Sequence, residues 1–133
     1  MSEGTGAGVY VLDASALLAA MLGEPGAERV REVLSEARVG TVNLSEVVAK
    51  LQDHGVPDPV IDESLEDLGL VVVPFDAAQA VRAGKLRGIT RAAGLSLGDR
   101  ACLALAGEIG GIALTTDRAW NAIRVGVAIE QAR

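Results

Sequence analysis

Short runs of apolar residues alternate along this chain with longer segments in which apolar residues recur every three or four positions. The first run, residues 9–12, ends on Asp13 and precedes an Ala- and Leu-rich segment, so it predicts a buried strand followed by a helix at 14–22. The same patterns predict strands at 38–42, 70–73, 112–115 and 125–129, and helices at 27–37, 44–54, 57–68, 77–87, 97–109 and 119–123. This alternation predicts a single α/β domain, a central parallel β-sheet with helices on both faces.

Turn and capping residues mark the boundaries of these segments. Asn43 is predicted to cap the helix at 44–54, and Ser96 the helix at 97–109. Residues 88–95 are polar and contain glycine, so we expect a loop there. The run at 70–73 holds no polar residue, which is typical of a parallel strand covered on both faces.

The composition is that of one folded domain. The chain has 133 residues, of which 50% are hydrophobic, and we expect residues 9–133 to form the domain and the polar residues 1–8 to be a flexible extension. No signal-peptide pattern and no apolar run near the ~18 residues of a membrane span is present. Because Cys102 is alone, an internal disulfide is excluded. We therefore expect a cytoplasmic protein that does not enter a membrane.

The net charge of the chain argues against some modes of nucleic-acid binding. A net charge of −6 argues against electrostatic coating of nucleic acid, and the three aromatic residues are too few for a base-stacking platform. Four basic residues nevertheless fall within ten positions, and Arg118 follows an acid of interest. The four are Arg82, Lys85, Arg87 and Arg91. Either a solvated helix face or a set of RNA phosphate contacts explains them.

Four acids are predicted to meet at one edge of the sheet. Asp13 and Asp117 each come just after a predicted strand, and the carboxyl ends of parallel strands share an edge. Glu46 and Asp99 lie near the starts of helices that begin at the same edge. We therefore expect all four carboxylates to lie close together.

Helix capping is a competing explanation for each acid taken alone. Asn43 with Glu46, and Ser96 with Asp99, have the spacing of capping boxes, while Asp13 and Asp117 can themselves cap helices. Four crowded carboxylates, however, repel one another unless a cation neutralises them. Oxygen ligands favour Mg²⁺ or Mn²⁺ over zinc, and the only histidine, His54, is predicted at the far end of its helix.

Four segments that carry these acids resemble the motifs of the PIN domain, and most closely those of the small VapC-type toxin ribonucleases. The segments are 11–15 (VLDAS), 43–47 (NLSEV), 97–104 (LGDRACLA) and 114–120 (LTTDRAW). The resemblance implies an acidic metal site formed by Asp13, Glu46, Asp99 and Asp117, with Ser15 and Thr115 as supporting hydroxyls. It also implies Mg²⁺-dependent RNA cleavage, a homodimer and inhibition by a cognate antitoxin.

Two apolar helix faces are expected to bind partner proteins. In so short and apolar a chain, we expect the faces of 27–34 and 44–51 to be partly exposed to an antitoxin or a second copy.

Two other classes of α/β protein that bind Mg²⁺ fit the sequence less well. A receiver-like domain would show an adjacent acidic pair, and a haloacid-dehalogenase-like phosphatase would have an Asp where Ser15 stands. A housekeeping RNA-processing nuclease, a DNA-directed nuclease and an inactive PIN-fold binding module stay open as alternatives. If the protein cleaves RNA, the remote His54 argues for attack by metal-activated water, which leaves a 5′-phosphate and a 3′-hydroxyl.

Overall fold

A computed structural model describes residues 9–133, and the expectation for residues 1–8 lies outside the described part of the chain. Its centre is a five-stranded, entirely parallel sheet with the strand order β3-β2-β1-β4-β5. The strands are β1 (Tyr10–Leu12), β2 (Ala37–Gly40), β3 (Val71–Val73), β4 (Ile112–Thr115) and β5 (Ala128–Gln131). The predicted parallel α/β fold is therefore confirmed.

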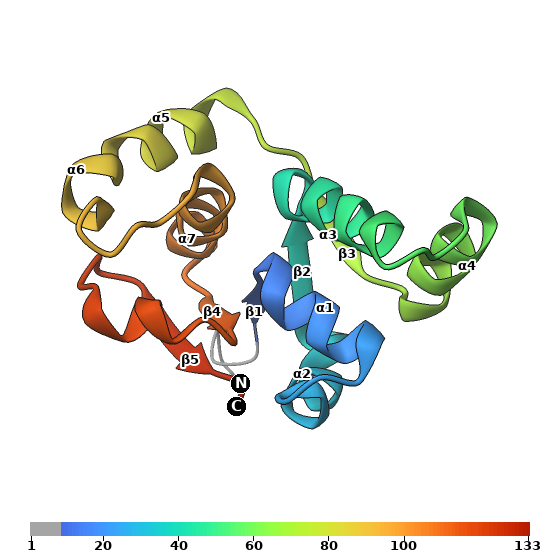
Figure 1. Cartoon of the computed structure of the whole chain (residues 1–133). Helices are drawn as coiled ribbons and strands as arrows, with labels where there is room; N and C mark the ends of the chain where they lie inside the picture. The colour runs from blue at the N-terminus through green and yellow to red at the C-terminus, as the bar shows by residue number, and fades with distance from the viewer. Residues whose placement is uncertain (1–8) are drawn as a thin grey trace, which may run out of the picture.

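Helices cover both faces of this sheet (Figure 1). One side carries α1 (Ala14–Leu22), α2 (Ala27–Val33), α3 (Thr41–Asp53) and α4 (Asp58–Leu68). The other side carries α5 (Ala77–Lys85), α6 (Arg87–Thr90) and α7 (Leu97–Ile109). Two short 3-10 helices, η2 (Leu34–Glu36) and η3 (Arg118–Ala122), lead into later strands. Among the described residues, none of these helices has the length and apolar content that crossing a bilayer would require.

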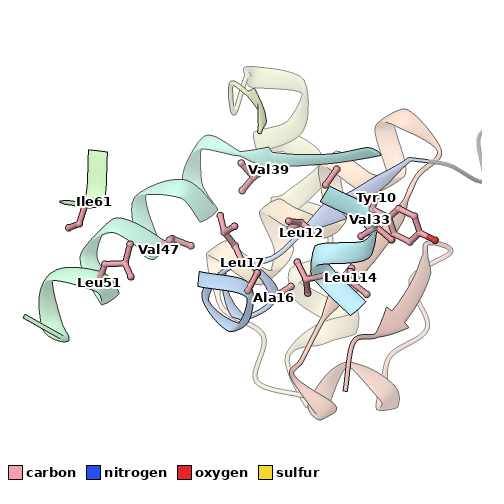
Figure 2. Close-up of a cluster of buried hydrophobic side chains, with 13 residues drawn as sticks. Tyr10, Leu12, Ala16, Leu17, Val33, Val39, Val47, Leu51, Ile61 and Leu114 are labelled. Carbon is pink, nitrogen blue, oxygen red and sulfur yellow. The ribbon is translucent and has the colours of Figure 1, made fainter. Parts of the chain in front are cut away.

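The central strands bury side chains on both faces because successive residues point to opposite sides. Leu12 and Leu114 pack with α1 to α4, as Figure 2 shows, whereas Val11 and Ala113 pack against α7 and Trp120. The lone Cys102 is fully buried on α7.

The boundary between β2 and α3 differs from the prediction. The strand ends at Gly40, which pairs with Val73, and Pro74 follows the partner strand and lacks the N–H that would continue the ladder. The helix therefore begins at Thr41, whose hydroxyl accepts the backbone N–H of Phe75 at 3.0 Å. Asn43 is thus the third residue of α3 and not its cap, which is Gly40.

Three other predicted elements are corrected in detail. The predicted helix at 27–37 stops at Val33, and the predicted loop at 88–95 contains the end of α6, where the buried Thr90 hydroxyl donates to the Leu86 carbonyl. The last strand is 128–131 and not 125–129, because Gly126, at φ +71°, bends the chain before pairing with β4 begins.

The expectation that β3 is covered on both faces is wrong. This strand lies at an edge of the sheet, and Val71 and Val72 are 52% and 42% exposed. The apolar faces of α2 and α3 lie mostly in the core, where Val30, Val33, Val47 and Leu51 are buried. Leu34, Leu44 and Val48 on the expected faces are partly exposed. The exposed large apolar side chains of the described residues lie on β3, at Val60 of α4 and on α5, α6 and α7, where they are Val81, Ile89, Leu97 and Ile109.

Candidate active site at the carboxyl edge of the sheet

Asp13 is the most deeply buried of the four acids, at 2% exposed. It follows β1 and caps α1, since its Oδ1 accepts the Ala16 backbone N–H at 2.8 Å. Two hydroxyls complete its surroundings: Ser15 donates at 2.7 Å, and Thr115 donates to Oδ2 at 2.5 Å. The carboxylate is therefore held from β1, α1 and β4 at once.

Burial raises the pKa of Asp13 to about 6, from an ordinary value of 3.8. The hydrogen bonds from Thr115, Ala16 and Ser15 lower this pKa, while the nearby charge of Asp99 raises it further. At neutral pH the group is an anion whose charge is poorly solvated, so a cation beside it would be strongly favoured.

The two hydroxyls also fix the loop that follows β4. Leu12 of β1 is paired with Leu114 of β4, so the residues after each strand lie side by side. Thr115 Oγ1 accepts the backbone N–H of Asp117, and Ser15 Oγ accepts that of Thr116, both at 3.0 Å. Ser15 and Thr115, both singled out in the sequence, therefore connect Asp13 to the loop of Asp117.

Glu46 comes from α3 and is partly buried. Its Oε1 accepts a hydrogen bond from Asn43 Nδ2 at 3.1 Å. Burial is the main cause that raises its pKa, and the charge of Asp99 adds to the rise, while Asn43 and Lys50 lower it. The predicted capping box of Asn43 and Glu46 is not formed, because Asn43 does not cap the helix. Helix capping thus does not explain this acid.

Asp99 lies in the first turn of α7 and forms the predicted capping box. Its Oδ2 accepts the Ser96 backbone N–H at 2.9 Å, and Ser96 Oγ accepts the Asp99 N–H at 3.2 Å. Its charge acts on both Asp13 and Glu46. Burial raises the pKa of the Cys102 thiol, and the charges of Asp13, Asp99 and Glu46 raise it further. Three predicted acids thus converge from β1, α3 and α7.

Asp117 lies beside this group but faces its own helix. It is exposed, and its Oδ1 accepts the Ala119 N–H at 2.9 Å, which caps η3. Its charge is not among the causes of the pKa shifts of Asp13 or Glu46. Within residues 9–133, no three acid, His or Cys side chains are arranged as a finished metal-binding cluster. The caps of Asp99 and Asp117 each use one carboxylate oxygen, however, and every carboxylate has a second.

The basic residues singled out in the sequence lie on α5, on α6, just after α6 and on η3. Arg82 extends over Gly107, near the end of α7 away from Asp99, with its Nη1 2.6 Å from where a β-carbon at Gly107 would lie. Arg118 is exposed next to Asp117. Exposed positions at the end of α5 and around α6 hold the remaining three, Lys85, Arg87 and Arg91.

Two residues at this edge were not predicted to belong to the site. Asn43 and Gly98 both contact Glu46, from α3 and α7 respectively. Asn43 stands three positions before Glu46, a spacing that in the sequence indicated a cap. The predicted remote histidine is confirmed, since His54 is exposed at the far end of α3 with Nδ1 2.8 Å from the Lys50 carbonyl.

Comparison with known proteins agrees with this architecture. The PIN domain family matches residues 10–126. Ribonuclease VapC42 of Mycobacterium tuberculosis is 34% identical over 106 residues, which are 72% of this chain and 81% of that protein. The VapC ribonuclease Mb2780c of Mycobacterium bovis matches equally well.

Solved structures share the fold at low sequence identity. DNA-bound VapBC from Salmonella typhimurium matches with a TM-score of 0.73 at 19% identity, over 94% of this chain and 98% of that one. FitAcB from Neisseria gonorrhoeae matches with a TM-score of 0.68 at 18% identity, over 93% and 98%. With the carboxylate edge described above, these matches identify the chain as a member of the PIN domain family, in the group that contains the VapC ribonucleases.

Proposed function

We propose that this protein is a Mg²⁺- or Mn²⁺-dependent endoribonuclease and the toxin of a toxin–antitoxin pair. The observation that carries the proposal is the burial of Asp13 beside the charge of Asp99, which also acts on Glu46. Membership in the group that contains the VapC ribonucleases gives the activity its class.

The residues at this edge fit a hard divalent cation. Asp13, Glu46 and Asp99 offer only oxygen atoms, the ligands that Mg²⁺ and Mn²⁺ prefer. Asp117 would join them by rotating away from the Ala119 N–H, or would orient a water molecule from its present position. Because a cation offsets both the repulsion among the acids and the cost of burying Asp13, its binding is favoured by the same features that raise the pKa values.

Each residue then has a distinct role in RNA cleavage. A bound divalent ion supplies Lewis-acid stabilisation of the phosphate charge and lowers the pKa of water. Asp13, Glu46 and Asp99 would hold that ion, and Ser15 and Thr115 keep Asp13 anionic and in place. Arg118 is available to bind the phosphates of the scissile strand, as are the exposed Lys85, Arg87 and Arg91, whereas Arg82 would first have to leave Gly107.

Water is the nucleophile that the site favours. Cleavage by the RNA 2′-hydroxyl needs a general base and acid, usually histidine, and His54 lies at the far end of α3 from the acids. In-line attack by water with departure of the 3′-oxygen leaves a 5′-phosphate and a 3′-hydroxyl. Incubation of mixed-sequence RNA with the purified protein, with Mg²⁺ or with EDTA, tests this function, and cleavage should require the metal ion.

The partners of the proposed toxin are a cognate antitoxin and a second copy of the chain. Supporting this, apolar residues are exposed on β3 and α4, and a groove of about 420 Å³ between α1, α3 and α4 is lined by apolar residues that include Met21, Leu51 and Leu68. An RNA substrate and a single buried thiol both suit the cytoplasm.

The product of the neighbouring gene is the reagent that tests this assignment. Co-purification of that product, a higher melting temperature of the complex and loss of RNA cleavage are the expected results. Light scattering should give the mass of a dimer for the toxin alone. A monomer at all concentrations, with no gain in stability on adding the neighbouring product, would contradict the assignment.

A further inference from the structure

Asn43 is a buried polar residue that has no capping role. It is 1% exposed in the first turn of α3, where the helix cap is Gly40. Its Nδ2 donates two hydrogen bonds, one to Glu46 Oε1 at 3.1 Å and one to the Gly98 carbonyl at 3.0 Å. One amide group therefore joins the carboxylate of α3 to the first turn of α7, next to Asp99.

The Glu46 carboxylate occupies the space where a side chain at Gly98 would lie. A β-carbon at this position would overlap the carboxyl atoms of Glu46, closer than real atoms approach. The residue is buried and helical, so the absence of a side chain is required by the space that Glu46 occupies and not by an unusual backbone conformation.

We propose that Asn43 and Gly98 are positioning residues that hold the Glu46 carboxylate beside Asp99, ready to ligate the cation. The inference rests on the proposed metal-dependent function. A glutamate side chain loses considerable rotamer freedom when it is fixed in one position. Asn43 and Gly98 fix the Glu46 side chain before the cation binds. The side-chain entropy is therefore lost on folding and does not reduce the free energy of metal binding.

The test is Mn²⁺ titration calorimetry of the metal-free, full-length protein and its variants. Asn43→Ala and Gly98→Ala should each weaken Mn²⁺ binding about 5- to 20-fold, within the range of coupling between neighbouring groups. Since the atom displaced in Gly98→Ala is the end of a flexible side chain, that variant should fold with nearly unchanged thermal stability.

A double-mutant cycle separates positioning from general damage to the fold. If Asn43 acts through Glu46, then adding Asn43→Ala to Glu46→Gln should change the Mn²⁺ affinity less than about twofold. The same holds for Gly98→Ala in that background. If the double variant instead shows the product of the two single fold-changes in Mn²⁺ affinity, the residues act independently and the inference is overturned.

The chain offers matched controls for both substitutions. Gln79 is 2% exposed and its amide donates to the Pro74 carbonyl at 3.0 Å, so Gln79→Ala removes a comparable buried amide away from the acids. Gly84 lies in α5 with open space where a β-carbon would stand, since no atom beyond its chain neighbours and the adjacent helix backbone lies within 4 Å of that position. Gly84→Ala is therefore the control for Gly98→Ala. Both controls should bind Mn²⁺ as the wild type does.

The failure of the inference differs from the failure of the proposed function. If the wild type does not bind Mn²⁺, both are overturned. If the wild type binds Mn²⁺ and the folded Gly98→Ala variant binds it equally well, only the inference is overturned.

Discussion

Asp13 combines a buried position with a charge that the protein itself solvates poorly. In the folded protein its pKa is raised to about 6, so the folded state binds a proton more readily than the unfolded state between pH 3.8 and about 6. Stability associated with this group is therefore present below that window and is lost as the pH rises through it. At neutral pH, the metal-free protein retains the buried charge at a cost of about 3 kcal/mol.

Asp13→Asn should remove this pH dependence. The metal-free variant is expected to be more stable than the wild type at pH 7, by up to about 3 kcal/mol, with the difference shrinking toward about pH 4. Urea denaturation at several pH values in EDTA measures it. A variant that is less stable than the wild type at neutral pH would show that hydrogen bonds to the carboxylate outweigh its desolvation.

The Thr115 hydroxyl should control the affinity of the site through Asp13. Thr115→Val keeps the shape and removes the 2.5 Å hydrogen bond, so the pKa of Asp13 should rise further. The hydroxyl also holds the Asp13 carboxylate in place and accepts the Asp117 N–H. Loss of a group that orients a metal ligand weakens metal binding by about tenfold or more, so Thr115→Val should bind Mn²⁺ roughly tenfold more weakly despite the stronger attraction of the less stabilised carboxylate for a cation. Thr115→Ser should restore binding in the same calorimetric titration, and equal affinities for all three proteins would contradict this role.

Some residues of the candidate site can be placed from their position relative to a predicted strand, and others only from tertiary contacts. Asp13 directly follows one predicted strand and Thr115 ends another, so the direction of the strands places them at the same edge. Ser15 and Thr115 were named as supporting hydroxyls only through the resemblance to the PIN domain. Asn43 was misassigned because its spacing to Glu46 is also that of a capping box, and its second partner, Gly98, is 55 residues away. The contact between Gly98 and Glu46 is likewise formed only by tertiary packing of α3 on α7.

Among the helices and strands, α7 couples helix capping to the candidate site. Ser96→Ala removes the acceptor of the Asp99 N–H and should cost about 1 kcal/mol of unfolding free energy. The Ser96 backbone N–H still donates to the Asp99 carboxylate, but the first turn of α7 that carries Asp99 is held less firmly, so Mn²⁺ affinity should fall as well.

Asp76→Ala is the matched control for this prediction. Asp76 caps α5 by accepting the Gln79 N–H at 2.8 Å, remote in sequence from the four acids. Asp76→Ala should lower the thermal stability about as much as Ser96→Ala does, and it should leave the Mn²⁺ affinity unchanged. Equal losses of affinity in both variants would mean that capping affects the site only through global stability.

The element boundaries show which signals are local. The cap Ser96 was predicted because it acts within three residues of itself. The end of β2 depends on its pairing with β3, which stops at Gly40 and Val73. The exposure of Val71 and Val72 depends on the order of strands in the sheet. An apolar run cannot by itself distinguish a central strand from an edge strand.

Across the molecule as a whole, strand order determines where the acids meet. The chain runs outward from β1 through β2 to β3 on one side, and β4 and β5 complete the sheet on the other. The order thus reverses between β1 and β4, and the carboxyl ends of strands at such a reversal are where α/β proteins bind ligands. Asp13 follows the central strand at that point, with α7 and its Asp99 leading into β4.

The chemical ends of the RNA fragments distinguish hydrolysis by metal-activated water from attack by the RNA 2′-hydroxyl. Mixed-sequence RNA would be cleaved with Mg²⁺ or with excess EDTA, with Asp13→Asn as the inactive control, and both ends of the products identified. We predict 5′-phosphate and 3′-hydroxyl ends, produced only in the presence of the metal ion. Products with 2′,3′-cyclic phosphates, or full cleavage in EDTA, would contradict metal-dependent hydrolysis at this site.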